Sequence, residues 1–75
     1  MTLVIEKHNA VNDTLTAKIE IDKFSSVYGL IICQYSLSDP DIAYPVHKVY
    51  YSTVKAAQQA LKRYGNRYGI TWTKQ

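Results

Sequence analysis

Several residue types and sequence features are scarce in this chain, and each scarcity excludes some classes of protein. The chain has a single cysteine, Cys33, so no disulfide can form within it, and a reducing compartment is expected. No apolar run approaches the ~18 residues that predict a membrane span. The first residues, Met1 to Glu6, lack the basic region and the long apolar run of a signal peptide. These absences predict a cytoplasmic protein that has no membrane partner.

Acidic residues are missing from the C-terminal part of the chain. Residues 1–41 hold three lysines and six acids, a net charge of −3, whereas residues 42–75 hold six basic residues and no acid, a net charge of +6. This polarity favours a partner of opposite charge, either an acidic protein surface or a nucleic acid. The alternative interpretation is a solvated basic helix face beside an acidic hairpin.

Motifs that carry chemistry are absent as well. His8, His47 and Cys33 do not show zinc-like spacing, and Asp39 and Asp41 lack the glycine and the later glutamate of a calcium loop. There is no glycine-rich phosphate loop and no nucleophile motif. Cys33 lies in the most apolar stretch, where a thiol is typically buried and inert. We therefore expect no enzymatic activity, no metal and no cofactor.

What the chain does contain is one clear amphipathic helix. Apolar residues recur at spacings of three and four and form one stripe, namely Val54, Ala57, Leu61 and Tyr64. Ser52 or Thr53 can cap the first turn, and Gly65 is expected to end the helix in the left-handed conformation. The spacing predicts a helix near residues 53–64. A helix of this length is marginal alone and needs a surface to pack on.

Alternating apolar residues predict strands that supply this surface. Residues 15–21 alternate strictly, and their apolar face consists of Leu15, Ala17, Ile19 and Ile21. Residues 28–37 are apolar on both faces at their start, as is typical of a central strand. Two further strands and a short last strand are expected at residues 3–8, 46–51 and 70–73.

The order of these elements predicts an α+β fold, with residues 1–75 forming a single domain. We expect an antiparallel β-meander of about four strands with one C-terminal helix packed across one face. Turns are expected at residues 9–13 and at residues 38–41, where Pro40 fixes φ. A chain of this length buries only a modest core, so a homodimer would supplement its stability.

Basic and aromatic residues are interleaved in the C-terminal part, which makes it the candidate binding surface. Tyrosine, tryptophan and arginine anchor protein interfaces, whereas basic residues among aromatics can also contact phosphates and stack on bases. Lys55 and Lys62 are seven residues apart, so both point the same way. The expected interface comprises the helix, the following turn and one strand residue: Lys48, Lys55, Lys62, Arg63, Arg67 and Tyr68.

The segment from Tyr50 to Leu61 joins a strand, a Ser/Thr cap and an Ala-x-x-x-Leu spacing. It resembles the end of strand–strand–strand–helix DNA-binding domains such as integrase arm-binding modules. Those domains dock the face of their sheet in the groove, so the resemblance implies DNA binding. Here the wet face of the 15–21 strand carries Lys18 beside Glu20 and Asp22, and these acids disfavour DNA. The pattern is generic and assigns no family.

We therefore expect a non-catalytic binding module that docks on an acidic protein surface or complex. A small domain with strong charge polarity and many tyrosines has the profile of small phage-encoded inhibitors, including anti-CRISPR proteins, by analogy of class and not by motif. Direct binding of DNA or RNA is the alternative, and no base-reading consensus supports it. The acidic hairpin, as a mimic of DNA, is a second candidate interface.

Overall fold

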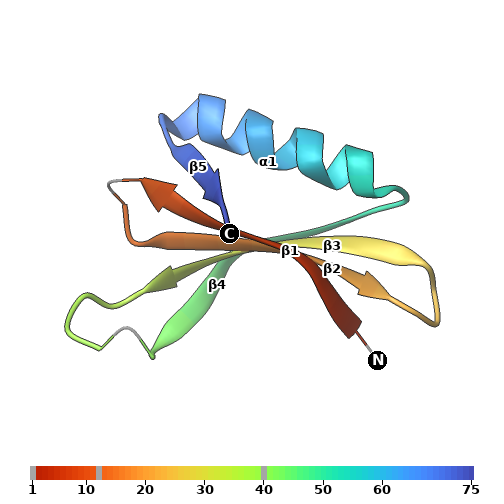
Figure 1. The fold of residues 1–75 in the computed structure, drawn as a ribbon, viewed down its shortest axis with the longest axis horizontal. Helices are drawn as coiled ribbons and strands as arrows, with labels where there is room; N and C mark the ends of the chain where they lie inside the picture. The colour runs from red at the N-terminus through yellow and green to blue at the C-terminus, as the bar shows by residue number, and fades with distance from the viewer. Residues whose placement is uncertain (1, 12, 40) are drawn as a thin grey trace.

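Five antiparallel strands form one sheet, and a helix lies across one of its faces in the computed structural model, which describes residues 2–11, 13–39 and 41–75 (Figure 1). The elements follow one another as β1 (Thr2–Val11), β2 (Leu15–Asp22), β3 (Val27–Tyr35), β4 (Ala43–Tyr51), α1 (Val54–Tyr68) and β5 (Thr71–Lys74). The expected α+β fold, an antiparallel meander with one C-terminal helix packed across it, is confirmed.

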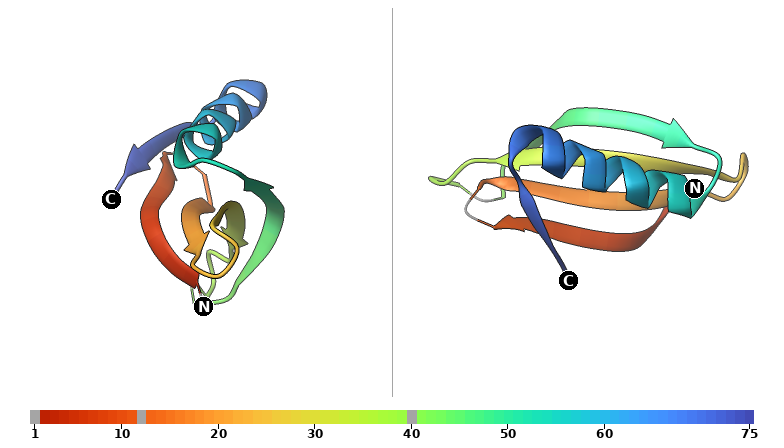
Figure 2. Two further views of the ribbon diagram at one scale, coloured as in Figure 1. Left: turned by 90° about the vertical axis from the view of Figure 1, so that its right-hand side faces the viewer. Right: turned by 90° about the horizontal axis from the view of Figure 1, so that it is seen from above.

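The strand order in the sheet is β4-β3-β2-β1-β5. The first four strands form the meander, and β5 returns after the helix to pair with the far side of β1. Figure 2 shows the helix above the sheet, with β4 on one side and β1 and β5 on the other. The two sides of the helix therefore face different surroundings, a long edge strand on one side and a short returning strand on the other.

The core lies between the helix and strands β2 and β3. Its buried members are Leu15, Ala17, Ile19, Leu30, Ile32, Ala57, Ala60 and Leu61. The alternation in β2 correctly predicted that Leu15, Ala17 and Ile19 are buried, whereas Ile21, one residue before the strand ends, is only half-buried. Cys33 is also half-buried rather than buried, and it lies on the sheet face that the helix does not cover.

The helix begins where the sequence indicates and ends later. Thr53 is the N-cap, and its Oγ1 accepts a hydrogen bond from the Ala56 N–H at 3.1 Å. The predicted end at Gly65 is wrong, because the left-handed cap is Gly69, with a φ of 68°. Gly65 is buried inside the helix, where a Cβ would lie 2.6 Å from the Ile70 carbonyl oxygen and 3.0 Å from Trp72 Nε1. This glycine serves the close approach of β5 to α1.

Three strand ends also differ from the prediction by two residues or more. β4 begins at Ala43, three residues before the predicted start at Val46. β1 extends to Val11, because residues 8–11 pair with β5, so the predicted turn at residues 9–13 begins too early. β3 ends at Tyr35, two residues before the predicted end. In the β3–β4 turn the Ile42 N–H donates to the Asp39 carbonyl oxygen at 3.0 Å. Pro40 and Asn12 of the two predicted turns lie outside the described residues.

Candidate binding groove between α1 and β4

The structure divides the predicted site residues among three places. Arg63, Arg67 and Tyr68 line a shallow groove between α1 and β4, together with His47, Tyr51, Ala60 and Tyr64. Lys62 instead faces a hollow on the β5 side of the helix. Lys55 precedes Lys62 by two turns and lies on that same side. Lys48 lies on the opposite face of the sheet, near Gly29 and Tyr50. The structure thus brings three of the six predicted residues together.

Aromatic rings form the floor of the groove. The rings of His47 and Tyr64 have centroids 5.1 Å apart, and those of Tyr64 and Tyr68 are 4.6 Å apart, both pairs being tilted by about 50°. The Arg67 guanidinium carbon lies 5.5 Å from the centroid of the Tyr68 ring, within the range of a cation–π contact. The groove has a volume of about 440 Å³. The groove therefore combines tyrosine rings with arginines, and both residue types are enriched among the residues that dominate binding at protein interfaces.

The Tyr64 phenol remains neutral over the physiological pH range. Burial is the main cause that raises its pKa, and the neighbouring Tyr68 and the charge of Asp13 raise it further. Tyr64 also packs against the hydrophobic core, so its ring is fixed between the core and the groove. The phenol therefore supplies a rigid, uncharged surface beside the two arginines.

Neither arginine of the groove belongs to an ion pair among the described residues, although the charge of Asp13 reaches Tyr64 beside them. In the part of the chain that the structure describes, the ion pairs join Glu6 to His8 and Lys74, and Glu20 to Lys18. Arg63 and Arg67 belong to none of these pairs, and both are exposed. Arg67 lies over the Tyr68 ring, and the exposed guanidinium groups of both arginines can donate to a carboxylate in a bidentate contact.

The other side of the helix is tied to the sheet by Glu6. Its carboxylate accepts hydrogen bonds from Gln58 of α1 and from His8 at 3.0 Å, and Lys74 of β5 lies 3.9 Å away. Burial pushes the pKa of Glu6 upward, but the hydrogen bonds from Gln58 and His8 and the Lys74 charge outweigh it and lower this pKa below its usual 4.5. Here Gln58, His8 and Lys74 all contact one carboxylate, whereas the buried indole N–H of Trp72 on the same side has no hydrogen-bond partner among the described residues.

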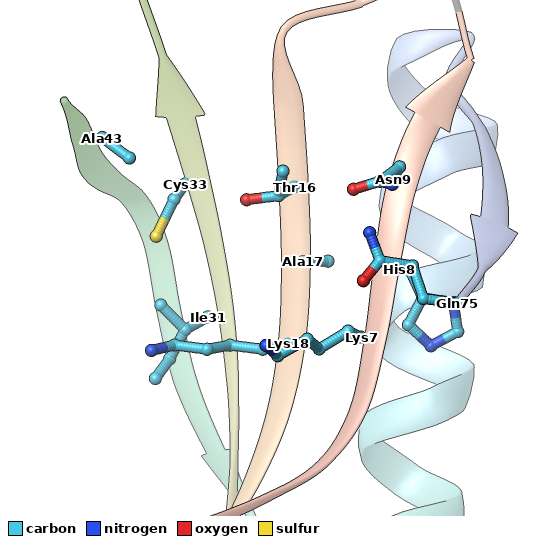
Figure 3. Close-up of a pocket in the computed structure, with 10 residues that line it drawn as sticks. All are labelled: Lys7, His8, Asn9, Thr16, Ala17, Lys18, Ile31, Cys33, Ala43 and Gln75. Atoms are coloured by element: carbon cyan, nitrogen blue, oxygen red, sulfur yellow. The ribbon is translucent and has the colours of Figure 1, made fainter. Parts of the chain in front are cut away.

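The sheet face away from the helix carries a row of lysines. In the strand register Lys7 pairs with Lys18, Lys18 with Ile31, and Ile31 with Lys48. Figure 3 shows the Lys7 side chain extending from β1 to β2 and the Lys18 side chain extending from β2 across Ile31, with Cys33 further along β3. The Lys18 Nζ forms an ion pair with the Glu20 carboxylate at 3.0 Å. The Lys48 Nζ lies 5.7 Å from the centroid of the Tyr50 ring. This face is mixed in charge and separate from the groove.

Sequence reasoning missed His47, Tyr51 and Tyr64 as members of the groove. The signal for two of them was available, because His47 shares its strand parity with Tyr51, and that parity faces the helix. Tyr64 was predicted as a core residue, and it does contact the core. What the sequence did not show is that the same ring borders the two arginines.

Within the described ranges no three potential metal-binding side chains (His, Cys, Asp or Glu) gather into one cluster, and no helix is long and apolar enough to cross a membrane. Comparisons with known proteins found no matching family model, no matching curated protein and no matching solved structure.

Proposed function

We propose that this chain is a non-catalytic protein-binding module whose α1–β4 groove takes an acidic segment of a partner protein. The observation that carries the proposal is the pair of exposed arginines, Arg63 and Arg67, which form no ion pair among the described residues and lie beside the Tyr64–Tyr68 ring pair. Arginine and tyrosine dominate the energetics of protein interfaces, and unpaired positive charge accelerates encounter with an acidic surface. Small phage-type inhibitors, including anti-CRISPR proteins, would be one use of such a module, by analogy of class alone.

The helix itself offers a matched control. Arg63→Glu with Arg67→Glu reverses two charges in the groove, and Lys55→Glu with Lys62→Glu reverses two charges on the other side of the same helix. Both pairs change the net charge equally. Binding of a short glutamate-rich peptide, measured by calorimetry at low salt, is expected to fall at least about tenfold (~1.4 kcal/mol) in the arginine variant. The lysine variant is expected to stay within about threefold of the unchanged protein. Equal losses in both variants would contradict a localised groove.

Nucleic acid is the second candidate partner, and the lysine row across the open sheet face is the observation that favours it. Glu20 neutralises one of these lysines, which weakens the case. The two partners differ in their response to salt. Binding of single-stranded DNA or RNA should lose affinity with a steep log–log slope, and Lys7→Ala or Lys48→Ala should each reduce that slope by about one. A protein interface should depend on salt mainly through its association rate.

A further inference from the structure

The outer edge of β4 is the longest free strand edge in the molecule as described. β4 lies at the end of the sheet order and pairs with β3 on one side only. Its nine residues carry large apolar side chains that are unusually exposed: Tyr44 at 55%, Val46 at 43%, Val49 at 37% and Tyr50 at 56%. A free edge with apolar flanks is a template for an additional strand.

Three features of β4 limit where a strand can add and which strand can do so. Pro45 has no N–H to donate, and the pairing register with β3 shifts between Ile32 and Cys33, opposite the Pro45 end of β4. Lys48 places a charge within the strand, as protected edges often do. Beyond the register shift, residues 47–51 pair with β3 in an unbroken register. Within β4, residues 47–51 are therefore the part that offers a regular edge to an added strand.

This regular stretch borders the groove. His47 and Tyr51 point to the helix side of the sheet and line the groove together with Arg63 and Arg67. A strand added beside residues 47–51 would direct every second side chain to the same side. Those side chains would lie next to the two guanidinium groups, so carboxylates there would find bidentate partners.

We infer that the partner segment binds as an added β-strand along residues 47–51 of β4, with acidic side chains at alternate positions facing Arg63 and Arg67. This inference rests on the proposed function and specifies its mode. The backbone of β4 contributes the hydrogen bonds and thereby the alignment, while the arginines select for acidic residues at every second position.

A second copy of the chain fits this edge less well than an acidic partner. β4 carries no acid, and residues 42–75 hold none, so two β4 strands would bring Lys48 and the groove arginines of both copies together without a counter-charge. Like charges that meet across an interface disfavour association. The charge of the edge therefore favours a partner of opposite sign over a homodimer.

The test uses synthetic peptides of about seven residues, blocked at both ends, with the full protein. The first alternates glutamate and valine. The second has the same sequence but carries N-methyl groups on two adjacent central residues, so that each edge of the peptide loses one hydrogen-bond donor while its charge is unchanged. The third alternates lysine and valine. Affinity is measured by calorimetry, and amide exchange of residues 47–51 is followed by NMR in the free and the bound protein.

The inference predicts that the acidic peptide binds, that its N-methylated form binds at least about tenfold more weakly, and that amides within residues 47–51 gain protection from exchange. If the N-methylated peptide binds equally well and Arg63→Glu with Arg67→Glu abolishes both, the groove stands and strand addition is wrong. If the acidic peptide binds no better than the lysine peptide, both the inference and the proposed function fail. A protein dimer that the acidic peptide does not dissociate, with residues 47–51 already protected, would assign the edge to a second copy and overturn the inference.

Discussion

The two sides of helix α1 differ in how their polar groups are used. Toward β5, Gln58, Glu6, His8 and Lys74 bind one another, and Gly65 lets Trp72 approach the helix closely. Toward β4, Arg63 and Arg67 stand beside aromatic rings and belong to none of the ion pairs among the described residues. On the β5 side the Glu6 carboxylate is bound by its neighbours, although Lys55 and Lys62 on that side also belong to none of these ion pairs. On the β4 side the two arginines lie beside aromatic rings, where a partner can reach both kinds of group.

This difference shows that the basic residues of one helix need not form a single basic surface. Lys62 and Arg63 are adjacent in sequence, yet 100° of helical rotation separates them, so Lys62 lies toward β5 and Arg63 lies toward β4. A surface patch defined by counting charges along the helix would merge two places with different chemistry.

The β5 side should be the more sensitive to added volume. Gly65→Ala is expected to lower the free energy of unfolding by about 2–3 kcal/mol, because the new Cβ would meet the Ile70 carbonyl oxygen and the Trp72 indole. The midpoint temperature of thermal unfolding should fall by about 10–20 °C. Gly69→Ala is the control: it has a φ of 68° and open space around it, so strain alone should cost about 1 kcal/mol. A Gly65→Ala protein that is more stable than the unchanged protein, as helix propensity alone predicts, would contradict the tight β5 seam.

On the β4 side the two tyrosines should separate stability from binding. Tyr64→Ala is expected to lower the free energy of unfolding by about 2 kcal/mol, because the ring contacts the core. Tyr68 is 57% exposed, so Tyr68→Ala should change stability by less than about 0.5 kcal/mol while weakening the acidic peptide by about tenfold. Denaturant titration and calorimetry measure the two effects. Equal stability losses would place both rings in the core and weaken the case for an anchor at Tyr68.

The Glu6 contacts should make the stability of the β5 side depend on pH. The pKa of Glu6 is lowered in the folded protein, so its stabilisation is present above its ordinary value of 4.5 and is lost as the pH falls through the lower folded value. Glu6→Gln should cost about 1 kcal/mol at neutral pH. The difference from the unchanged protein should shrink below about pH 4.5, as measured by urea unfolding across pH. A difference that stays constant down to pH 2 would exclude the carboxylate charge as its source.

The smallest effect is expected away from both sides of the helix. Cys33 lies half-buried on the open sheet face, opposite Thr16 in the register. Cys33→Ser should change the free energy of unfolding by less than about 0.5 kcal/mol, because the exposed part of the side chain already contacts water. It should leave the peptide affinity unchanged. A loss of peptide binding in a folded Cys33→Ser protein would show that the open face takes part in recognition.

Much of the fold follows from local patterns in the sequence. The period of two in β2 predicted which side chains enter the core, and the Val54–Ala57–Leu61–Tyr64 stripe predicted the buried side of α1. The start of the helix follows from Thr53, because capping is a contact within one turn. These features were accessible because they depend on neighbours a few residues apart.

The sequence by itself thus determined the strands, the helix, the buried stripe and the uneven distribution of charge. Only the tertiary structure decided that α1 continues through Gly65, because the close approach of Trp72 is a contact between separate elements. It likewise decided that β1 extends to Val11, where β5 pairs with it. The assignment of Arg63 and Arg67 to one side and of Lys62 to the other depends on where the sheet lies under the helix. The spacing of residues in the sequence determines the angle between their side chains around the helix axis. The packing of the helix on the sheet determines which part of the molecule each side chain faces.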